Sequence, residues 1–195
     1  VLNYTTSGGF VTVRIDNGDP ITLFPGSSLG PFAEGGHTVR VEAANAAGTG
    51  FDEVAFTVDT VAPTVSITSP VAGTSKNRTP ILTFTKSDGN AVVTVDGNAV
   101  AIDSGQALSS LSDGLHTISV EATDAAGNRG ATQVSFVVDN IPPTIYIESP
   151  AEGMIHTTSV PLTYGISDGV AVVSVDEGTS TTKPSGSTLD SLTNG

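Results

Sequence analysis

The sequence predicts an all-β protein made of tandem β-sandwich domains, each with about seven antiparallel strands. Apolar residues alternate with Thr, Ser and Glu in short runs, which is the period of a strand with one buried face. Turns rich in Gly, Pro, Asn and Asp separate these runs, and no helical periodicity continues beyond one turn. About seven short strands within roughly 80 residues are typical of a β-sandwich.

A repeat of 80 residues organises the chain. The phrase DTVAPTVSITSP at 59–70 returns as DNIPPTIYIESP at 139–150, a spacing of 80. The phrase HTVRVEA at 37–43 precedes HTISVEA at 116–122 by 79 residues. A spacing that holds within one residue across three copies indicates tandem domains more strongly than any single motif.

The repeat predicts three domains, of which only the middle one is whole. Residues 62–141 hold a complete set of strands, whereas 1–61 lack the first strand and 142–195 lack the last two. We interpret the chain as part of a longer array. A second hypothesis applies if the chain truly starts at Val1: the open edge of the first domain would then accept a strand donated by another chain.

Within the middle domain, inward-facing apolar residues mark each expected strand. The first ends at Ser69-Pro70, and Asp96-Gly97-Asn98 closes the third as a hairpin turn. Asp96 and its counterpart Asp176 are interpreted as turn residues. In chain order the marking residues are Val65 and Ile67, Leu82 and Phe84, Val93 and Val95, Leu108 and Leu111, then Ile118, Val120 and Ala122, and finally Val134, Phe136 and Val138.

The composition excludes several classes of function. The net charge is −13, from 20 acidic and 7 basic residues, which argues against a nucleic-acid partner and against an anionic membrane surface. The chain has no cysteine, so an extracellular form depends on core packing or bound ions for stability. No apolar run is long enough for a transmembrane helix, and we expect no membrane insertion in this segment.

Three phrases carry a family resemblance: DTVAPTVSITSP, GLHTISVEATDAAGN and VSFVVDN. At constant spacing they resemble the tandem bacterial immunoglobulin-like (Big-type) domains of extracellular surface proteins and adhesins, and the resemblance covers essentially all 195 residues. It implies Ig-like β-sandwiches, an extracellular or cell-surface location in bacteria, and a stalk or adhesive role. The Cys and Trp residues of antibody domains are absent, which leaves the wider sandwich class.

No catalytic motif stands out, and we predict that the protein is not an enzyme. The histidines are His37, His116 and His156. The first two share one repeat position near the start of a strand, where a tyrosine of immunoglobulin domains bonds to the backbone. We expect the histidines to make that structural bond. The G-x-S-x-G, H-E-x-x-H and P-loop motifs do not occur.

Acidic residues at turns and linkers are the candidates for a calcium site. The hairpin EATDAAGN offers Asp124 and Asn128, the linkers offer Asp59 and Asp139, and we expect these features to meet at one end of a sandwich. The resemblance implies that such aspartates bind calcium between domains. The alternative is that each Asp only caps its own turn. Because Asn45 replaces Asp124 in the first copy, any calcium should bind better at the junction after the middle domain than at the one before it.

These observations together predict a non-enzymatic extracellular structural module, such as a stalk, sheath or filament element of a bacterial surface protein. The linker Asp139-Asn140-Ile141-Pro142-Pro143 is short, and its prolines restrict the backbone. The expected partners are neighbouring Ig-like repeats of the same longer chain or assembly. The alternative is an adhesin or a carbohydrate-binding accessory module of a secreted protein, with a glycan or protein receptor.

Overall fold

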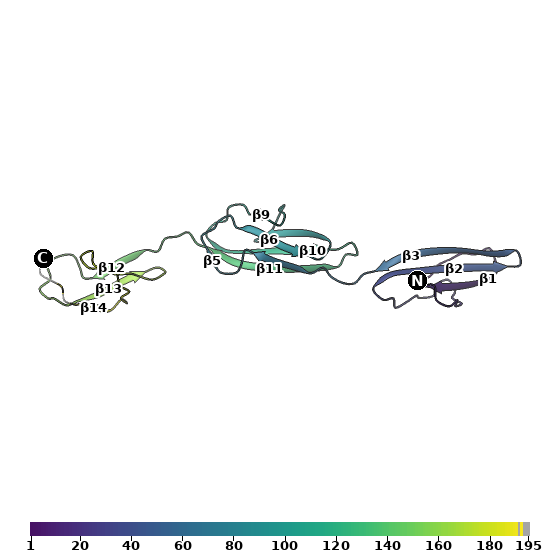
Figure 1. Ribbon diagram of the computed structural model, residues 1–195, viewed down its shortest axis with the longest axis horizontal. Helices are drawn as coiled ribbons and strands as arrows, with labels where there is room; N and C mark the ends of the chain where they lie inside the picture. Colours follow the sequence, from purple (N-terminus) through teal and green to yellow (C-terminus); the bar gives the residue numbers. More distant parts are fainter. Residues whose placement is uncertain (191, 193–195) are drawn as a thin grey trace. The chain divides into compact units, whose positions relative to one another are not determined.

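In the part of the chain that the structure describes, all regular secondary structure is β-strand (Figure 1). The computed structural model describes residues 1–190 and 192. It divides into two compact units, Val1–Val138 and Asp139–Gly195. The further division of the first unit at residues 61 and 62 rests on the sequence repeat and stays a prediction. In the described part of the chain, no helix is long and apolar enough to cross a membrane.

The strands between Val65 and Val138 form a sandwich of two sheets, which confirms the predicted fold class. One sheet has five strands in the order β5-β11-β10-β7-β8, and the other has three in the order β4-β6-β9. Strand pairs are antiparallel except for β5, which runs parallel to β11 and covers its edge. The strands are β4 (Val65–Ser69), β5 (Thr74–Ser75), β6 (Ile81–Lys86), β7 (Asn90–Val95), β8 (Asn98–Val100), β9 (Gln106–Ala107), β10 (Gly114–Thr123) and β11 (Arg129–Val138).

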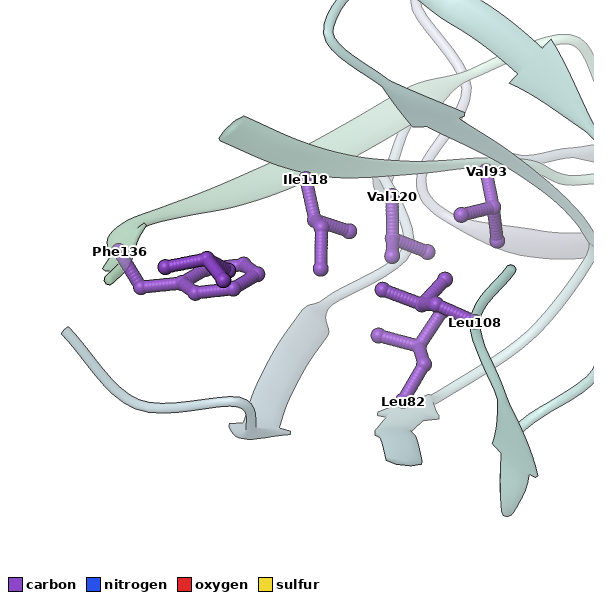
Figure 2. Close-up of a cluster of buried hydrophobic side chains, with 7 residues drawn as sticks. Leu82, Val93, Leu108, Ile118, Val120 and Phe136 are labelled. Atoms are coloured by element: carbon purple, nitrogen blue, oxygen red, sulfur yellow. The ribbon is translucent and has the colours of Figure 1, made fainter. Parts of the chain in front are cut away.

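The core of the middle domain lies between these two sheets. Figure 2 shows Ile118 and Val120 of β10 pointing toward Leu82 and Leu108, which come from the opposite layer. On β10, every second residue from His116 to Ala122 is buried, and Asp124, just after the strand, continues the series. The full set of buried core side chains is Leu82, Val93, Leu108, Ile118, Val120, Phe136 and Val138.

The turn after β7 is the predicted two-residue hairpin. Asp96 and Gly97 have φ angles of 51° and 80°, and Val95 pairs with Asn98 across the turn. Two successive positive φ values are those of a type I′ turn, whose twist matches the strands it joins. Gly97 adopts this conformation without strain because it has no Cβ.

The short strand expected around Leu108 and Leu111 lies earlier in the chain, and neither leucine is part of it. The strand β9 ends at Ala107, and the amides of Leu108 and Leu111 instead donate singly to the carbonyls of Pro80 (3.0 Å) and Arg78 (2.8 Å). Residues three apart face opposite sides of a regular strand. Both leucines reach the core only because the segment is irregular.

The flanking repeats each contain one three-stranded antiparallel sheet in the described residues. The first repeat has the order β1-β2-β3, with a small core of Leu2, Val13 and Val39. The third repeat has the order β12-β13-β14. Their strands are β1 (Phe10–Ile15), β2 (Gly35–Asn45), β3 (Gly48–Val58), β12 (Ile145–Ser149), β13 (Val160–Ile166) and β14 (Ser187–Leu189).

Truncation of one core leucine tests the position of the sandwich core. Leu82 is 0% exposed, so Leu82→Ala should destabilise the middle domain by about 2–5 kcal/mol through lost burial and a residual cavity. Leu115→Ala is the control, because Leu115 is 70% exposed and its loss should cost less than about 0.5 kcal/mol. Urea unfolding of both variants measures the difference, and equal destabilisation would contradict the assigned core.

Candidate functional site

The hairpin between β10 and β11 carries two of the predicted ligands. The alternation of buried and less buried residues along β10 continues to Asp124, which is only 8% exposed. Its carboxylate Oδ1 accepts a hydrogen bond from the amide of Asn128 (2.8 Å), and its carbonyl accepts one from Gly127 (3.3 Å). Gly127 has φ 94°, which a glycine adopts freely. Asp124 therefore caps its own turn, as the structural alternative predicts.

The side chain of Asn128 joins this hairpin to the linker that enters the domain. Its Nδ2 donates to the carbonyl oxygen of Asp59 (3.0 Å) and to Asp124 Oδ2 (3.0 Å), and it lies 3.5 Å from Asp59 Oδ1. Three of the four predicted residues thus come together. The fourth, Asp139, directly follows β11, whose ten residues put it about 30 Å from the hairpin turn.

The prediction that calcium would favour the junction after the middle domain is wrong in its geometry. In the antiparallel β10–β11 pair, Thr123 lies opposite Arg129 beside the turn, and Gly114 lies opposite Val138 at the far end. The turn is therefore at the end where the chain enters the domain. It meets Asp59 of the preceding linker.

The linker lies directly on the start of β11. A Cβ added to Gly130 would overlap the carbonyl oxygen of Pro63, so any larger residue must push the linker away. At Gly50, the counterpart in the first repeat, an added Cβ meets nothing within 4 Å. The glycine at position 130 therefore serves the contact with the linker.

Hydrogen bonds keep Asp124 ionised despite its burial. Burial raises the pKa of Asp124, but bonds from the Asn128 side chain and from the backbone amides of Asn128, Gly127 and Ala126 outweigh it. The net effect holds the pKa of this carboxyl below its ordinary value. At neutral pH the site therefore contains a buried carboxylate with an amide donor beside it.

The donor set fits calcium only in part. Two oxygens of Asp59 and one of Asp124 face Asn128 Nδ2, which is a hydrogen-bond donor and occupies the position that a cation would need. A half-turn of the amide would present Oδ1 instead and give four oxygens, whereas calcium takes six to eight. Among residues 1–190 and 192, no cluster of three or more His, Cys, Asp or Glu side chains is arranged to hold a metal. Calcium at this junction stays a prediction.

The two repeat histidines make the same set of contacts. His116 Nε2 bonds to the carbonyl of Ser112 (2.9 Å), and His37 Nε2 bonds to the carbonyl of Ala33 (2.7 Å). These bonds confirm the prediction that the histidine ties this corner to the backbone. Sequence reasoning missed the partner on the other ring nitrogen.

That partner is an aspartate interpreted from the sequence only as a turn residue. Asp96 Oδ2 lies 2.7 Å from His116 Nδ1, and Asp96 Oδ1 accepts the amide of Thr117 (2.8 Å). Asp16 makes the equivalent bonds to His37 and Thr38, both at 2.8 Å. The signal in the sequence is an Asp at nearly the same distance before each histidine, 20 or 21 residues.

No family model matches the chain, so the Big-type assignment stays a prediction. Halomucin of Haloquadratum walsbyi (strain DSM 16790 / HBSQ001) is 35% identical over 95 residues, which cover 44% of this chain and 1% of halomucin. Fibronectin(III)-like modules of Clostridium thermocellum CbhA give a TM-score of 0.38 at 19% identity, covering 70% of this chain and 82% of theirs. A tetra-tandem repeat in the extending region of a large adhesion protein gives 0.36 at 17% identity, covering 93% and 58%.

If calcium binds at this junction, the carboxylate of Asp124 would be one of its ligands. We expect isothermal titration of the chain with calcium to show saturable binding that Asp124→Asn weakens by at least about tenfold, since calcium affinity depends on ligand charge. Asp168→Asn is the matched control, because that carboxylate only accepts the amide of Gly169 in a turn of the third repeat. If the unaltered chain binds no calcium, the ion has no role here and Asn128 alone bridges the two aspartates.

Proposed function

We propose that the chain is a non-enzymatic structural module of an extracellular surface protein, in which successive domains build a stalk, sheath or filament element. The observation that carries this proposal is the bond from Asn128 of the middle domain to Asp59 of the linker (3.0 Å). It fixes the start of the linker to the domain that follows. A linker held in this way resists bending better than a solvated one.

Hydrogen bonds at both ends of the linker support the same role. The amide of Thr60 donates to Glu34 Oε2 of the first repeat (3.0 Å), and the amide of Thr64 donates to Ser87 Oγ of the middle domain (2.9 Å). Pro63, between them, fixes its own φ angle. These bonds and the fixed φ angle leave few linker residues whose backbone can rotate as a hinge.

The start of the third repeat has the same local bonds. Asp139 Oδ1 accepts the amide of Ile141 (2.9 Å), as Asp59 Oδ1 accepts that of Val61 (3.1 Å). Thr144 donates to Ser167 Oγ (2.9 Å). A linker conformation that is repeated with the domain favours an array with regular junctions.

The engagement of the histidines supports a non-enzymatic role. Both ring nitrogens of His37 and of His116 are already bonded, so neither imidazole is available as a base for an external nucleophile. The 80-residue repeat supports neighbouring repeats as the main partners. The similarity to a small part of halomucin supports a much longer protein with an extracellular or surface location. A bacterial source remains a prediction.

The adhesin or carbohydrate-binding alternative has less support. The middle domain has an open groove of about 430 Å³, lined by aliphatic residues such as Val95, Ile102 and Leu111. Its lining contains no aromatic side chain of the kind on which sugar rings stack. A glycan or protein receptor stays a prediction from the sequence.

The stiffness of the junction tests the proposed role. Because the chain lacks cysteine, Thr22→Cys and Ser109→Cys place two spin labels on exposed sites of the first and middle domains. Pulsed electron paramagnetic resonance should give a narrow distance distribution, and Asn128→Ala should broaden it by removing the bond to Asp59. Asn77→Ala is the control, because Asn77 bonds within its own turn, to Thr79.

A broad distribution in the chain without Asn128→Ala would contradict a stiff junction and with it the stalk role. Unchanged circular dichroism of the Asn128→Ala variant ensures that any broadening comes from the junction. A narrow distribution in both chains would mean that the junction is stiff but that Asn128 is not the cause.

A further inference from the structure

Both ring nitrogens of His116 face atoms that only accept hydrogen bonds. Nδ1 lies 2.7 Å from the carboxylate of Asp96, and Nε2 lies 2.9 Å from the carbonyl oxygen of Ser112. A neutral imidazole has one N–H, whereas the imidazolium has two. Only the protonated ring satisfies both contacts. In the neutral ring, one nitrogen lone pair must point at an oxygen.

The first repeat has the same arrangement. His37 Nδ1 lies 2.8 Å from Asp16, and its Nε2 lies 2.7 Å from the carbonyl of Ala33. The first repeat and the middle domain differ at most sequence positions, yet both place an imidazole between two hydrogen-bond acceptors. The contact belongs to the repeat and is not peculiar to one domain.

The histidine side chains are largely shielded from water, with 8% exposure for His116 and 10% for His37. Aromatic rings pack beside them: Phe136 lies 6.1 Å from the His116 ring, and Phe32 lies 4.8 Å from that of His37. Burial of this kind strengthens a correctly paired charge and penalises an unpaired one. The protonation state of the ring therefore matters to the stability of the domain.

The other charged groups near these rings are already paired or bonded. On the segment before β10, Asp113 is paired with Arg78 at 2.7 Å. On the segment before β2, Glu34 accepts the amide of Thr60. The charged groups that directly contact the two rings are Asp96 and Asp16.

We propose that each His–Asp pair is a proton-dependent latch. When the ring is charged, the histidine bonds both to the turn that contains the aspartate and to the loop that precedes the histidine's own strand. When the ring loses its proton, one of these bonds is lost. In the middle domain the latch holds the β7–β8 turn through Asp96 and the loop before β10 through Ser112. The carboxylate is the stronger acceptor, so a neutral ring keeps its Nδ1 proton. The loop at Ser112 is then the part that is released.

The direction of the pH dependence follows from the partners. The bond to Asp96, and then that to the Ser112 carbonyl, raise the pKa of His116 against the effect of burial. For His37, the Ala33 carbonyl contributes most and Asp16 next. The folded state thus binds the proton more tightly than the unfolded state. The latch contributes fully below the ordinary histidine pKa of about 6.5 and is lost as pH rises through the folded pKa.

The lower limit of the window comes from the aspartate. The bond from His116, followed by that from the amide of Thr117, lowers the pKa of Asp96. Its contribution is present above the ordinary Asp pKa of about 3.9 and disappears as pH falls through the folded value. The latch is therefore strongest between about pH 4 and pH 6.5. Above this range, each histidine reduces the folded-to-unfolded ratio by at most about tenfold per pH unit.

Nitrogen NMR of the histidine rings in the whole chain tests the latch without any substitution. At pH 6 we expect protons on both nitrogens of His37 and His116, and one proton lost from each ring at higher pH. Amide exchange of the loop before β10 should then accelerate beyond the intrinsic base catalysis. A ring with a single proton at pH 6, or a loop whose corrected exchange is constant from pH 6 to 8.5, would overturn the proposal.

The variant His116→Gln separates the latch from general alkaline effects. Glutamine donates to only one of the two acceptors, so the middle domain should lose stability at pH 6 and show a flatter pH profile. Peptides from β10 and β11, followed by hydrogen exchange in denaturant, report on this domain, and peptides from β2 and β3 should keep the response due to His37. His156→Gln is the control, because His156 is exposed in the third repeat. A wild-type pH response of the middle domain in His116→Gln would refute the latch.

Discussion

The inner face of β10 is the feature on which the rest of the structure depends. Ile118, Val120 and Ala122 are completely buried and hold the two sheets of the middle domain together. The stripe begins at His116 and ends at Asp124, which are the buried polar residues in the described part of the chain. A buried polar group is costly unless it is bonded. At one end, His116 bonds to Asp96 and Ser112 of other segments. At the other end, Asp124 bonds to Asn128 of its own hairpin, which in turn bonds to Asp59 of the linker.

Local patterns were enough to predict the fold class. Strict alternation marks strands such as β10, and Asp96-Gly97 marks a turn, because both depend on residues that are close in sequence. The pattern failed at Leu108 and Leu111, whose three-residue spacing has no counterpart in a regular strand. There the chain reaches the core through single backbone bonds, which side-chain periodicity does not reveal.

The contacts of the candidate sites were harder to predict, because they join residues far apart in sequence. The structure brings Asp59, Asp124 and Asn128 together, whereas placing Asp139 with them ignored the direction of the strands. The His116–Asp96 pair crosses from one strand to the next, 20 residues away. The alternation from Ile118 back to His116 was a usable signal, since it placed the ring on the inner face, where it needs partners.

The contacts at the two ends of β10 differ in whether they depend on protonation, and this difference matters for a tandem array. At the entry end, Asn128 supplies a neutral donor between two aspartates, so that contact depends on geometry more than on protons. At the exit end, Gly114, which is two residues before His116, lies opposite Val138, the last residue of β11. The chain thus leaves the domain beside the group whose bonds require a proton. The proposed latch acts on the loop at Ser112, just before the strand residues that pair with the end of β11, whereas the entry contact is held by the hairpin itself. The domain thus binds the preceding linker through a neutral donor, whereas its other end carries the bonds that the proposed latch makes dependent on a proton.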